Sequence, residues 1–196
     1  MANNCWNSIM ITSIDQEAKE KIVTFLESYN KYNYVCDWVN SLISKENQLT
    51  PNFDEGGDPY VYGAKWFDYE FDVEEDYINI SGDSAWSPVE GMCQAISKEF
   101  NCHVLINYSE SGCDFGGESN FINGEEDIMF EGSYRAYSYY SEGLECLNSD
   151  TDWIDDEETL NEIKKEWLSI VFKHDREIIE EWYKEELNRI TEIEKI

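Results

Sequence analysis

The chain has 196 residues, of which 41% are hydrophobic and 15% aromatic, so it can form a core and is not disordered as a whole. Its 43 acidic and 14 basic residues give a net charge of −29, which excludes binding to nucleic acid or an anionic membrane through a general basic surface. The chain has neither a run of 18 apolar residues nor an N-terminal signal pattern, so we expect no transmembrane helix and a cytoplasmic location.

The first third of the chain predicts one strand and two helical pieces. Residues 5–12 are rich in strand-forming residues. Ser13 and Gln16 form a capping-box pattern that predicts a helix over residues 14–30. Apolar residues at helical spacing predict a second helical piece within residues 33–48, and the glycines and prolines of residues 51–59 predict a loop.

The middle of the chain predicts three more strands and another helix. Residues 64–73 alternate between apolar side chains and carboxylates, which is typical of a half-buried strand. A turn at Glu75–Asp76 leads into a strand that begins at Tyr77, and Ser87–Pro88 predicts a helix start with Pro88 in the first turn. Residues 102–108 predict the next strand, and residues 118–123 and 127–131 predict a hairpin across Asn123–Gly124.

This order of elements predicts an α+β fold of the ferredoxin-like βαββαβ type, an antiparallel sheet with an extra β-hairpin and a long C-terminal helix or helical hairpin. The ferredoxin-like domain is expected over residues 1–125 and an acidic, aromatic-rich extension over residues 126–156. Residues 157–196 contain neither Gly nor Pro and form the predicted helical segment. A single helix over the last 36 of these residues would be about 54 Å long, and a break near Lys173–Arg176 would make it a hairpin.

Four short motifs resemble the Api-like proteins of phages and conjugative plasmids. They are Met-Ala-Asn-x-Cys-x-Asn at residues 1–7, Tyr-Gly-Ala-Lys-Trp at 62–66, Ser-Ala-Trp-Ser-Pro at 84–88, and the stretch 108–117 around Gly112-Cys113-Asp114. The resemblance covers about residues 1–125. It implies a ferredoxin-like domain and an origin in a mobile element, and it supplies no catalytic residue.

Most candidate sites have a simpler structural interpretation. Trp66 and Trp86 could line a ligand groove, but aromatic residues in such turns usually pack against the core. Residues 112–117 could bind an anion, yet the nearby carboxylates would repel it, and a tight turn that exposes Cys113 is favoured. Cys102 and His103 are neighbours on a strand and should point to opposite faces, so we expect no catalytic pair and no enzyme.

Cysteine and histidine usage argues against metal sites and cofactors. The six cysteines are scattered without a Cys-x-x-Cys pair, which predicts reduced thiols. The two histidines, His103 and His174, give no zinc-ligand spacing, and His174 falls on an apolar helix face. We therefore expect no metal and no cofactor.

The negative charge is concentrated in the middle of the chain. Residues 53–160 carry 27 acidic and three basic residues, whereas residues 1–52 and 161–196 are nearly balanced. Carboxylates two residues apart on a strand are about 6.6 Å apart, close to the spacing of phosphates along one nucleic-acid strand. The candidate acidic surface comprises Asp68, Glu70, Asp72, Glu74, Glu75, Asp76, Asp83, Glu125, Glu126, Asp127, Asp152, Asp155 and Asp156.

These features favour a non-enzymatic protein whose acidic surface mimics nucleic acid and blocks a basic groove of a host defence complex, as an anti-CRISPR or anti-restriction inhibitor would. Its partner would be a basic nucleic-acid-binding protein of the host, with neither nucleic acid nor membrane bound directly. The candidate apolar anchors are Trp153, Tyr137, Tyr139 and Tyr140. The alternatives are an oligomeric adaptor that forms a homodimer through residues 157–196, and a metal-dependent hydrolase that uses the acidic residues. A solvated charged face without a partner also fits the composition.

Overall fold

A computed structural model describes residues 3–48, 60–151, 162, 165, 166, 169, 170 and 173. The chain divides into two compact units, residues 1–131 and residues 132–196. Within the described residues, none of the helices has the length and apolar character needed to cross a membrane. The predicted loop at 51–59 and the choice between one helix and a hairpin over 157–196 lie outside the described residues.

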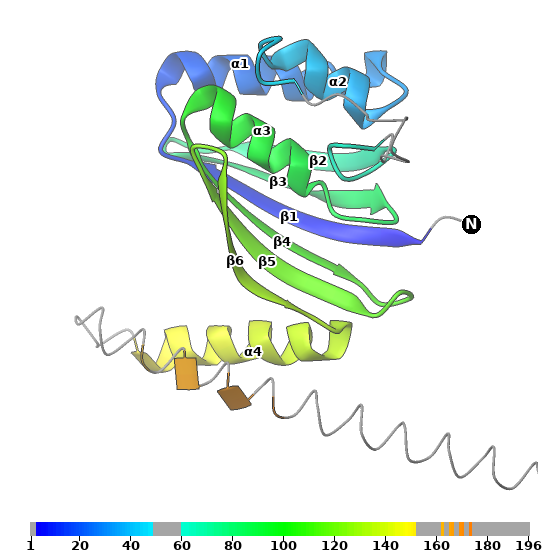
Figure 1. The fold of residues 1–196 in the computed structure, drawn as a ribbon. Coiled ribbons are helices and arrows are strands. Elements are labelled where there is room, and N and C mark those ends of the chain that lie inside the picture. The colour runs from blue at the N-terminus through cyan, green and yellow to red at the C-terminus, as the bar shows by residue number, and fades with distance from the viewer. Residues whose placement is uncertain are drawn as a thin grey trace, which may run out of the picture. The chain divides into compact units, whose positions relative to one another are not determined.

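The first unit is built on one six-stranded sheet with the order β2-β3-β1-β4-β5-β6 (Figure 1). Its strands are β1 Asn4–Thr12, β2 Phe67–Val73, β3 Tyr77–Ala85, β4 His103–Glu110, β5 Phe115–Ile122 and β6 Glu125–Gly132. The pairs β1–β3, β1–β4, β2–β3 and β4–β5 are antiparallel. The order β2-β3-β1-β4 is that of a ferredoxin-like fold, and the hairpin β5–β6 widens the sheet beside β4. The predicted fold class is confirmed.

The hairpin between β5 and β6 forms where the sequence predicts it. Asn123 and Gly124 both have positive φ values, 55° and 80°. Two consecutive left-handed residues make the type I′ turn that matches the twist of antiparallel strands, and Asn-Gly is the dipeptide best suited to it.

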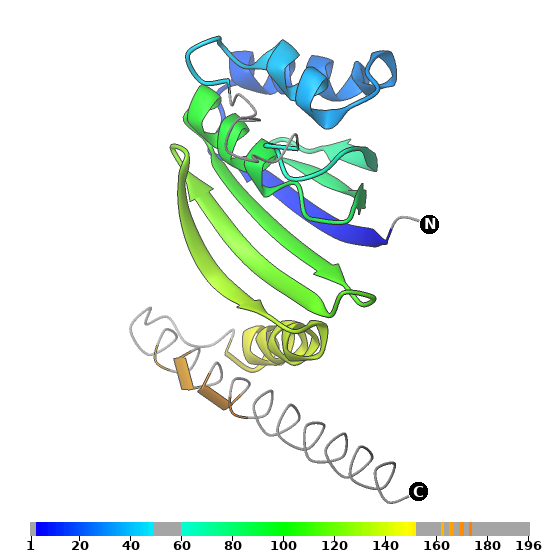
Figure 2. The same ribbon diagram turned by 45° about the vertical axis from the view of Figure 1, so that its right-hand side comes forward.

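Helices cover one face of this sheet, as the two views in Figures 1 and 2 show. They are α1 Gln16–Glu27, the short 3₁₀ helix η1 Tyr29–Lys31, α2 Val35–Leu42 and α3 Glu90–Phe100. In the second unit, α4 spans Tyr134–Thr151 and begins after Ser133, whose Oγ accepts a hydrogen bond from the Ala136 N–H at 3.1 Å.

Two helix starts differ from the sequence prediction. The first helix is capped by Asp15, whose carboxylate accepts the Ala18 N–H at 2.7 Å, whereas Ser13 lies before it with a φ of 56°. A carboxylate is a better cap than the predicted Ser13 because it also interacts favourably with the helix dipole. Pro88 also lies before its helix, since α3 begins at Glu90 with Val89 as its N-cap.

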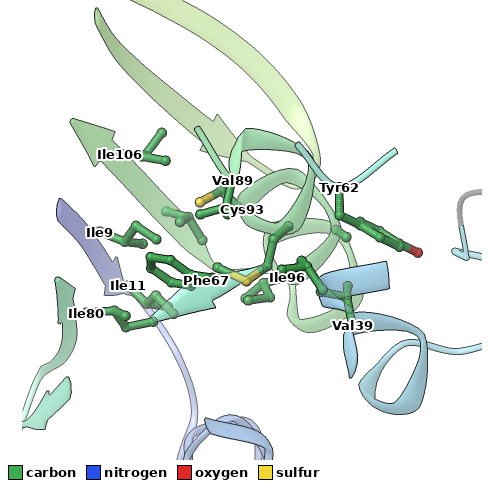
Figure 3. Close-up of a cluster of buried hydrophobic side chains, with 14 of the residues drawn as sticks. Ile9, Ile11, Val39, Tyr62, Phe67, Ile80, Val89, Cys93, Ile96 and Ile106 are labelled. Carbon is green, nitrogen blue, oxygen red and sulfur yellow. The ribbon is translucent and has the colours of Figure 1, made fainter. Parts of the chain in front are cut away.

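The hydrophobic core lies between the sheet and these helices. Ile9 on β1 pairs with Ile80 on β3 and Ile106 on β4, which puts three isoleucines side by side on the helix-covered face. Figure 3 shows these side chains facing Cys93 and Ile96 of α3. The strand alternation places the apolar side chains here and leaves the intervening ones for the other face.

An aromatic cluster joins α1, α2 and the edge strand β2. The buried Trp38 stacks on Phe25, with ring centroids 4.1 Å apart, and its indole N–H donates to the Phe25 carbonyl at 3.0 Å. Tyr69 of β2 also stacks on Trp38, with ring centroids 5.4 Å apart, and its hydroxyl donates to the Leu26 carbonyl at 2.5 Å. These contacts hold the apolar side chains of β2 against the helices. The side chains that alternate with them must therefore point away from the helices.

A buried asparagine connects the sheet to the start of α3. The side-chain amide of Asn7 donates to the Cys5 carbonyl at 2.8 Å and to Ser84 Oγ at 2.9 Å. Its oxygen accepts the Val89 N–H at 3.1 Å, one of the backbone donors that the first turn of a helix leaves without a partner. Ser84 Oγ continues the network to the Ser87 carbonyl at 2.7 Å.

Two carboxyl groups of α3 have opposite environments. Burial raises the pKa of Glu90, and the negative charges of Glu126 and Glu131 raise it further, against hydrogen bonds from Ser119 and Tyr108 that lower it. Burial also acts to raise the pKa of Glu99, but hydrogen bonds from Asn47 and Ser44, each 2.8 Å long, outweigh it, so this pKa lies below its ordinary value. The two groups must therefore affect stability in opposite directions.

Replacing Asn7 by Ala should destabilise the first unit by about 2–3 kcal/mol, because a buried donor without a partner costs about 1–3 kcal/mol and further hydrogen bonds are lost. Urea unfolding monitored by circular dichroism measures the change. Asn4→Ala, at an exposed position of the same strand, is the control and should change the free energy of unfolding by less than about 0.5 kcal/mol. Equal effects of the two substitutions would contradict the role given to Asn7.

Glu90→Gln should raise the free energy of unfolding at pH 7, and Glu99→Gln should lower it. A carboxyl whose folded-state pKa is raised binds its proton more readily in the folded protein, so wild-type stability should gain from Glu90 as the pH falls toward the ordinary value of 4.5. The lowered pKa of Glu99 has the opposite consequence: its contribution is present above that ordinary value and is lost at lower pH. Urea titrations at a series of pH values test both signs.

Candidate functional site

The main candidate site is a row of carboxylates on β2, an edge strand of the sheet. Asp68, Glu70 and Asp72 alternate with the buried or half-buried Phe67, Tyr69 and Phe71, and all three acidic side chains are exposed. They lie on the face of the sheet opposite α1, α2 and α3, which we call the open face. This is the carboxylate row that the alternation in residues 64–73 predicts.

A fourth carboxylate faces this row from the neighbouring strand. Asp83 on β3 is the direct cross-strand partner of Asp68. Like charges directly opposite each other in an antiparallel pair are destabilising. Among the described residues, no ion pair compensates Asp68, Glu70, Asp72 or Asp83. We call these four residues the acidic edge.

Basic residues are missing from the sheet altogether. None of the six strands contains a Lys or an Arg. The strands instead carry Asp68, Glu70, Asp72, Asp83, Glu110, Glu118, Glu125, Glu126, Asp127 and Glu131. Lys19, Lys21 and Lys98 belong to the helices that cover the opposite face. In the first unit, the strands therefore carry acidic residues without basic ones, and these lysines lie on the helices.

Glu74, Glu75 and Asp76 of the candidate acidic surface are exposed in the turn between β2 and β3, so they lie beyond the end of the row. The Glu74 N–H donates to the Tyr77 carbonyl at 2.9 Å and closes the turn. The ammonium group of the buried Lys19 on α1 donates to the carbonyls of Glu74 and Glu75, the latter at 2.8 Å. Because Lys19 binds backbone oxygens, it fixes the turn without neutralising its carboxylates through an ion pair.

The predicted acidic surface is not continuous. Glu125, Glu126 and Asp127 are exposed, but they lie on β6, at the opposite edge of the sheet from β2. Five steps between strands separate the two edges, about 24 Å. Asp152, Asp155 and Asp156 lie outside the described residues. The strand order thus splits a surface that the sequence suggests is one.

The candidate apolar anchors differ in their exposure to solvent. Tyr137 and Tyr140 are buried, with ring centroids 6.4 Å apart on α4, whereas Tyr139 is exposed. Trp153 lies outside the described residues. Among these tyrosines, Tyr139 therefore has the exposure that an anchor in an interface requires.

The open face also carries apolar side chains that sequence reasoning missed. Trp6 and Met10 on β1, Ile122 on β5 and Met129 on β6 are 42%, 38%, 51% and 45% exposed. A groove of about 120 Å³ is lined by Met10, Thr12, His103, Leu105, Glu118, Asn120 and Met129. The alternation of residues 5–12 could have revealed them. Trp6 and Met10 alternate with Cys5, Asn7, Ile9 and Ile11, and so point to the opposite face of the strand.

The cysteine and histidine candidates have the placement expected for a structural role. Cys102 is buried and its pKa is raised by burial to about 12, so it is a neutral thiol near pH 7. His103 contacts Asn120 on the open face, and Cys102 contacts the carbonyl of Ile96 on the helix-covered side. In the part of the chain that is described, no three His, Cys, Asp or Glu side chains cluster as a metal site.

Residues 110–113 form a turn closed by a carboxylate. Glu110 accepts the backbone N–H groups of Gly112, at 2.8 Å, and of Cys113. Burial acts to raise the pKa of Glu110, and these hydrogen bonds to its ionised form outweigh burial and lower it. Two of the backbone donors that an anion would need are therefore already used, and Cys113 is exposed as predicted.

The four resemblance motifs meet at one end of β1. The Asn3 carbonyl accepts the Trp86 N–H at 3.0 Å, and the Asn3 side chain donates to Cys113 Sγ at 3.2 Å. Ser87 Oγ donates to the Gly63 carbonyl and so extends the Asn7 network. Trp86 is 54% exposed with a φ of 73°, so it does not pack in the core, while Trp66 is half-buried. The contacts between these motifs therefore have a structural role: they connect the end of β1 to the neighbouring loops.

Comparisons with known proteins bear on the first unit and the start of the second. Searches of curated proteins and of solved structures found no significant match. Residues 61–145 match the family model described as the ferredoxin-like domain in Api92-like protein. That range runs from the start of the second motif through β2–β6 into α4. This part of the chain therefore matches the ferredoxin-like domain of Api92-like proteins, in agreement with the family that the motifs suggest.

Proposed function

We propose that the protein is a non-enzymatic inhibitor, encoded by a mobile element, whose acidic edge occupies a nucleic-acid-binding groove of a host defence complex. One observation carries this proposal. All six strands lack Lys and Arg, and the exposed row Asp68, Glu70 and Asp72 faces away from the helices. The resemblance to phage and plasmid proteins supports a role in conflict with a host, of the anti-CRISPR or anti-restriction type.

The spacing of the row fits a groove built for phosphates. Alternate residues on a strand are about 6.6 Å apart and point to the same side, so their carboxylates repeat at nearly the interval of phosphates along one strand. A groove lined with Lys and Arg binds such a row mainly through charge. The rigid strand holds the carboxylates in line at little cost in side-chain entropy.

The cross-strand pair argues against a purely solubilising role. A protein that needed only solubility could mix signs on this face, as α1 does with the Glu17–Lys21 ion pair at 2.8 Å. Placing Asp83 opposite Asp68 instead lowers stability without improving packing. A basic group of a partner would attract both carboxylates and relieve their mutual repulsion, which would favour binding.

Binding to the host partner should depend on the acidic edge. The full-length chain with Asp68→Asn, Glu70→Gln, Asp72→Asn and Asp83→Asn together should lose at least tenfold in affinity for the nuclease that the wild type retains from host lysate. The control variant carries Glu20→Gln, Glu27→Gln, Asp37→Asn and Glu46→Gln, which are exposed on the helical side and remove the same charge.

Two further properties distinguish mimicry from other binding. The captured protein should be released steeply as the salt concentration rises, and single-stranded DNA should compete with the inhibitor for it. Binding that survives high salt, ignores DNA, or falls equally in both variants would contradict the proposal.

Asp83→Asn should stabilise the isolated protein by about 0.2–1 kcal/mol at low salt, because it removes the like-charge pair with Asp68. The gain should shrink at 1 M NaCl, where the Debye length is about 3 Å. Urea unfolding at both salt concentrations measures it, with Glu20→Gln as the matched exposed control. A destabilised variant would mean that Asp83 has a favourable partner.

A further inference from the structure

We propose that the open face binds a basic amphipathic helix of the partner, with an apolar side chain of that helix in the groove between Met10 and Met129. This inference rests on the proposed function, since the acidic edge is one flank of the same face.

The apolar side chains of the open face lie along the centre of the sheet. Trp6 and Met10 share β1, and Met10 pairs with Leu105 on β4, so β1 and β4 supply the middle of the face. Met129 lines the same groove from β6. Apolar side chains that stay exposed around a groove often mark an interaction site.

The groove has the size and chemistry of an anchor site. Its volume of about 120 Å³ suits one aliphatic side chain of a partner, not a small-molecule substrate. Its two methionines are flexible and polarisable, so they adapt to side chains of different shape. Thr12, His103, Asn120 and Glu118 also line it and supply polar groups.

A helix suits this face better than an extended peptide does. The face of a sheet presents side chains, whereas its backbone groups are already paired between strands. An extended peptide lying on it would leave its own backbone N–H and C=O groups without partners in the interface. A helix satisfies these groups internally and presents one apolar stripe.

The arrangement of charge matches a helix with basic flanks. A helix about 10–12 Å wide covers roughly two strands, which are about 4.8 Å apart. The groove is lined from β1, β4, β5 and β6, so a helix seated on it lies over β4 and β5. Its flanks would then reach β1 and β3 on one side, with Asp83, and β6 on the other, with Glu125 and Asp127. Lys and Arg beside an apolar stripe would meet carboxylates on both sides.

Methionine-methyl NMR of the full-length protein tests this inference directly. The probe is an 18-residue amphipathic Leu/Lys peptide, and the control peptide has the same composition in an order that gives no apolar stripe. The amphipathic peptide should shift the Met10 and Met129 methyl signals and bind at least tenfold more tightly than the control peptide. Met92 of α3 is buried in the core on the other side of the sheet, so its methyl signal should not move.

Variants separate the anchor from the charge. Met10→Ser with Met129→Ser should cost at least tenfold in affinity for the amphipathic peptide and leave the weak binding of the control peptide unchanged. Met10→Leu with Met129→Leu should restore the affinity. The four-residue acidic-edge variant should weaken both peptides.

The outcomes distinguish this inference from the proposed function. Equal binding of the two peptides, abolished by the acidic-edge variant, would overturn the helix site and leave the charge-based function standing. Binding of neither peptide would overturn the helix site alone, since the host nuclease is tested separately. Met10 and Met129 signals that shift with protein concentration before any peptide is added would show that a second copy occupies the face, which also overturns the inference.

Discussion

The Asn7 side chain is the contact on which the rest of this domain depends. It lies in the central strand, gives a hydrogen-bond partner to the first turn of α3 and binds the end of β3. A buried amide that meets all these groups fixes one geometry, since any shift of α3 would leave a polar group without a partner. The isoleucines and aromatic residues supply the larger free energy, but they are compatible with more than one packing.

That fixed geometry decides where the charge goes. Once the apolar phase of β2 packs on Trp38 and Phe67 is buried, Asp68, Glu70 and Asp72 have one remaining direction. Asp83 must then face Asp68, because the register between β2 and β3 is set by the short turn that Lys19 holds. The electrostatic surface is in this sense a consequence of core packing, and it is as rigid as the sheet.

The fold could be predicted from the sequence because its signals are local. Alternation in residues 64–73, the Asn123–Gly124 turn and the order of elements each follow from neighbouring residues, and together they define a ferredoxin-like sheet. The site could be predicted only in part, because it depends on contacts between distant strands. The strand order, which separates Glu125 from Asp68, and the Asp68–Asp83 pairing arise from long-range register. The Asp15 cap was missed because Ser13 and Gln16 also match a capping pattern. The backbone conformation, with a positive φ at Ser13, makes Asp15 the N-cap.

The absence of Lys and Arg from the strands also determines how the chain can be cut. A protease specific for those residues has a site after Lys65, the next after Lys98, and then one after Arg135. Strands β2 and β3 therefore lie within one uncleavable stretch, and β4, β5 and β6 lie within another. Even when the domain opens, trypsin-like enzymes cannot divide these strands, so its sheet is protected by its composition as well as by its folding.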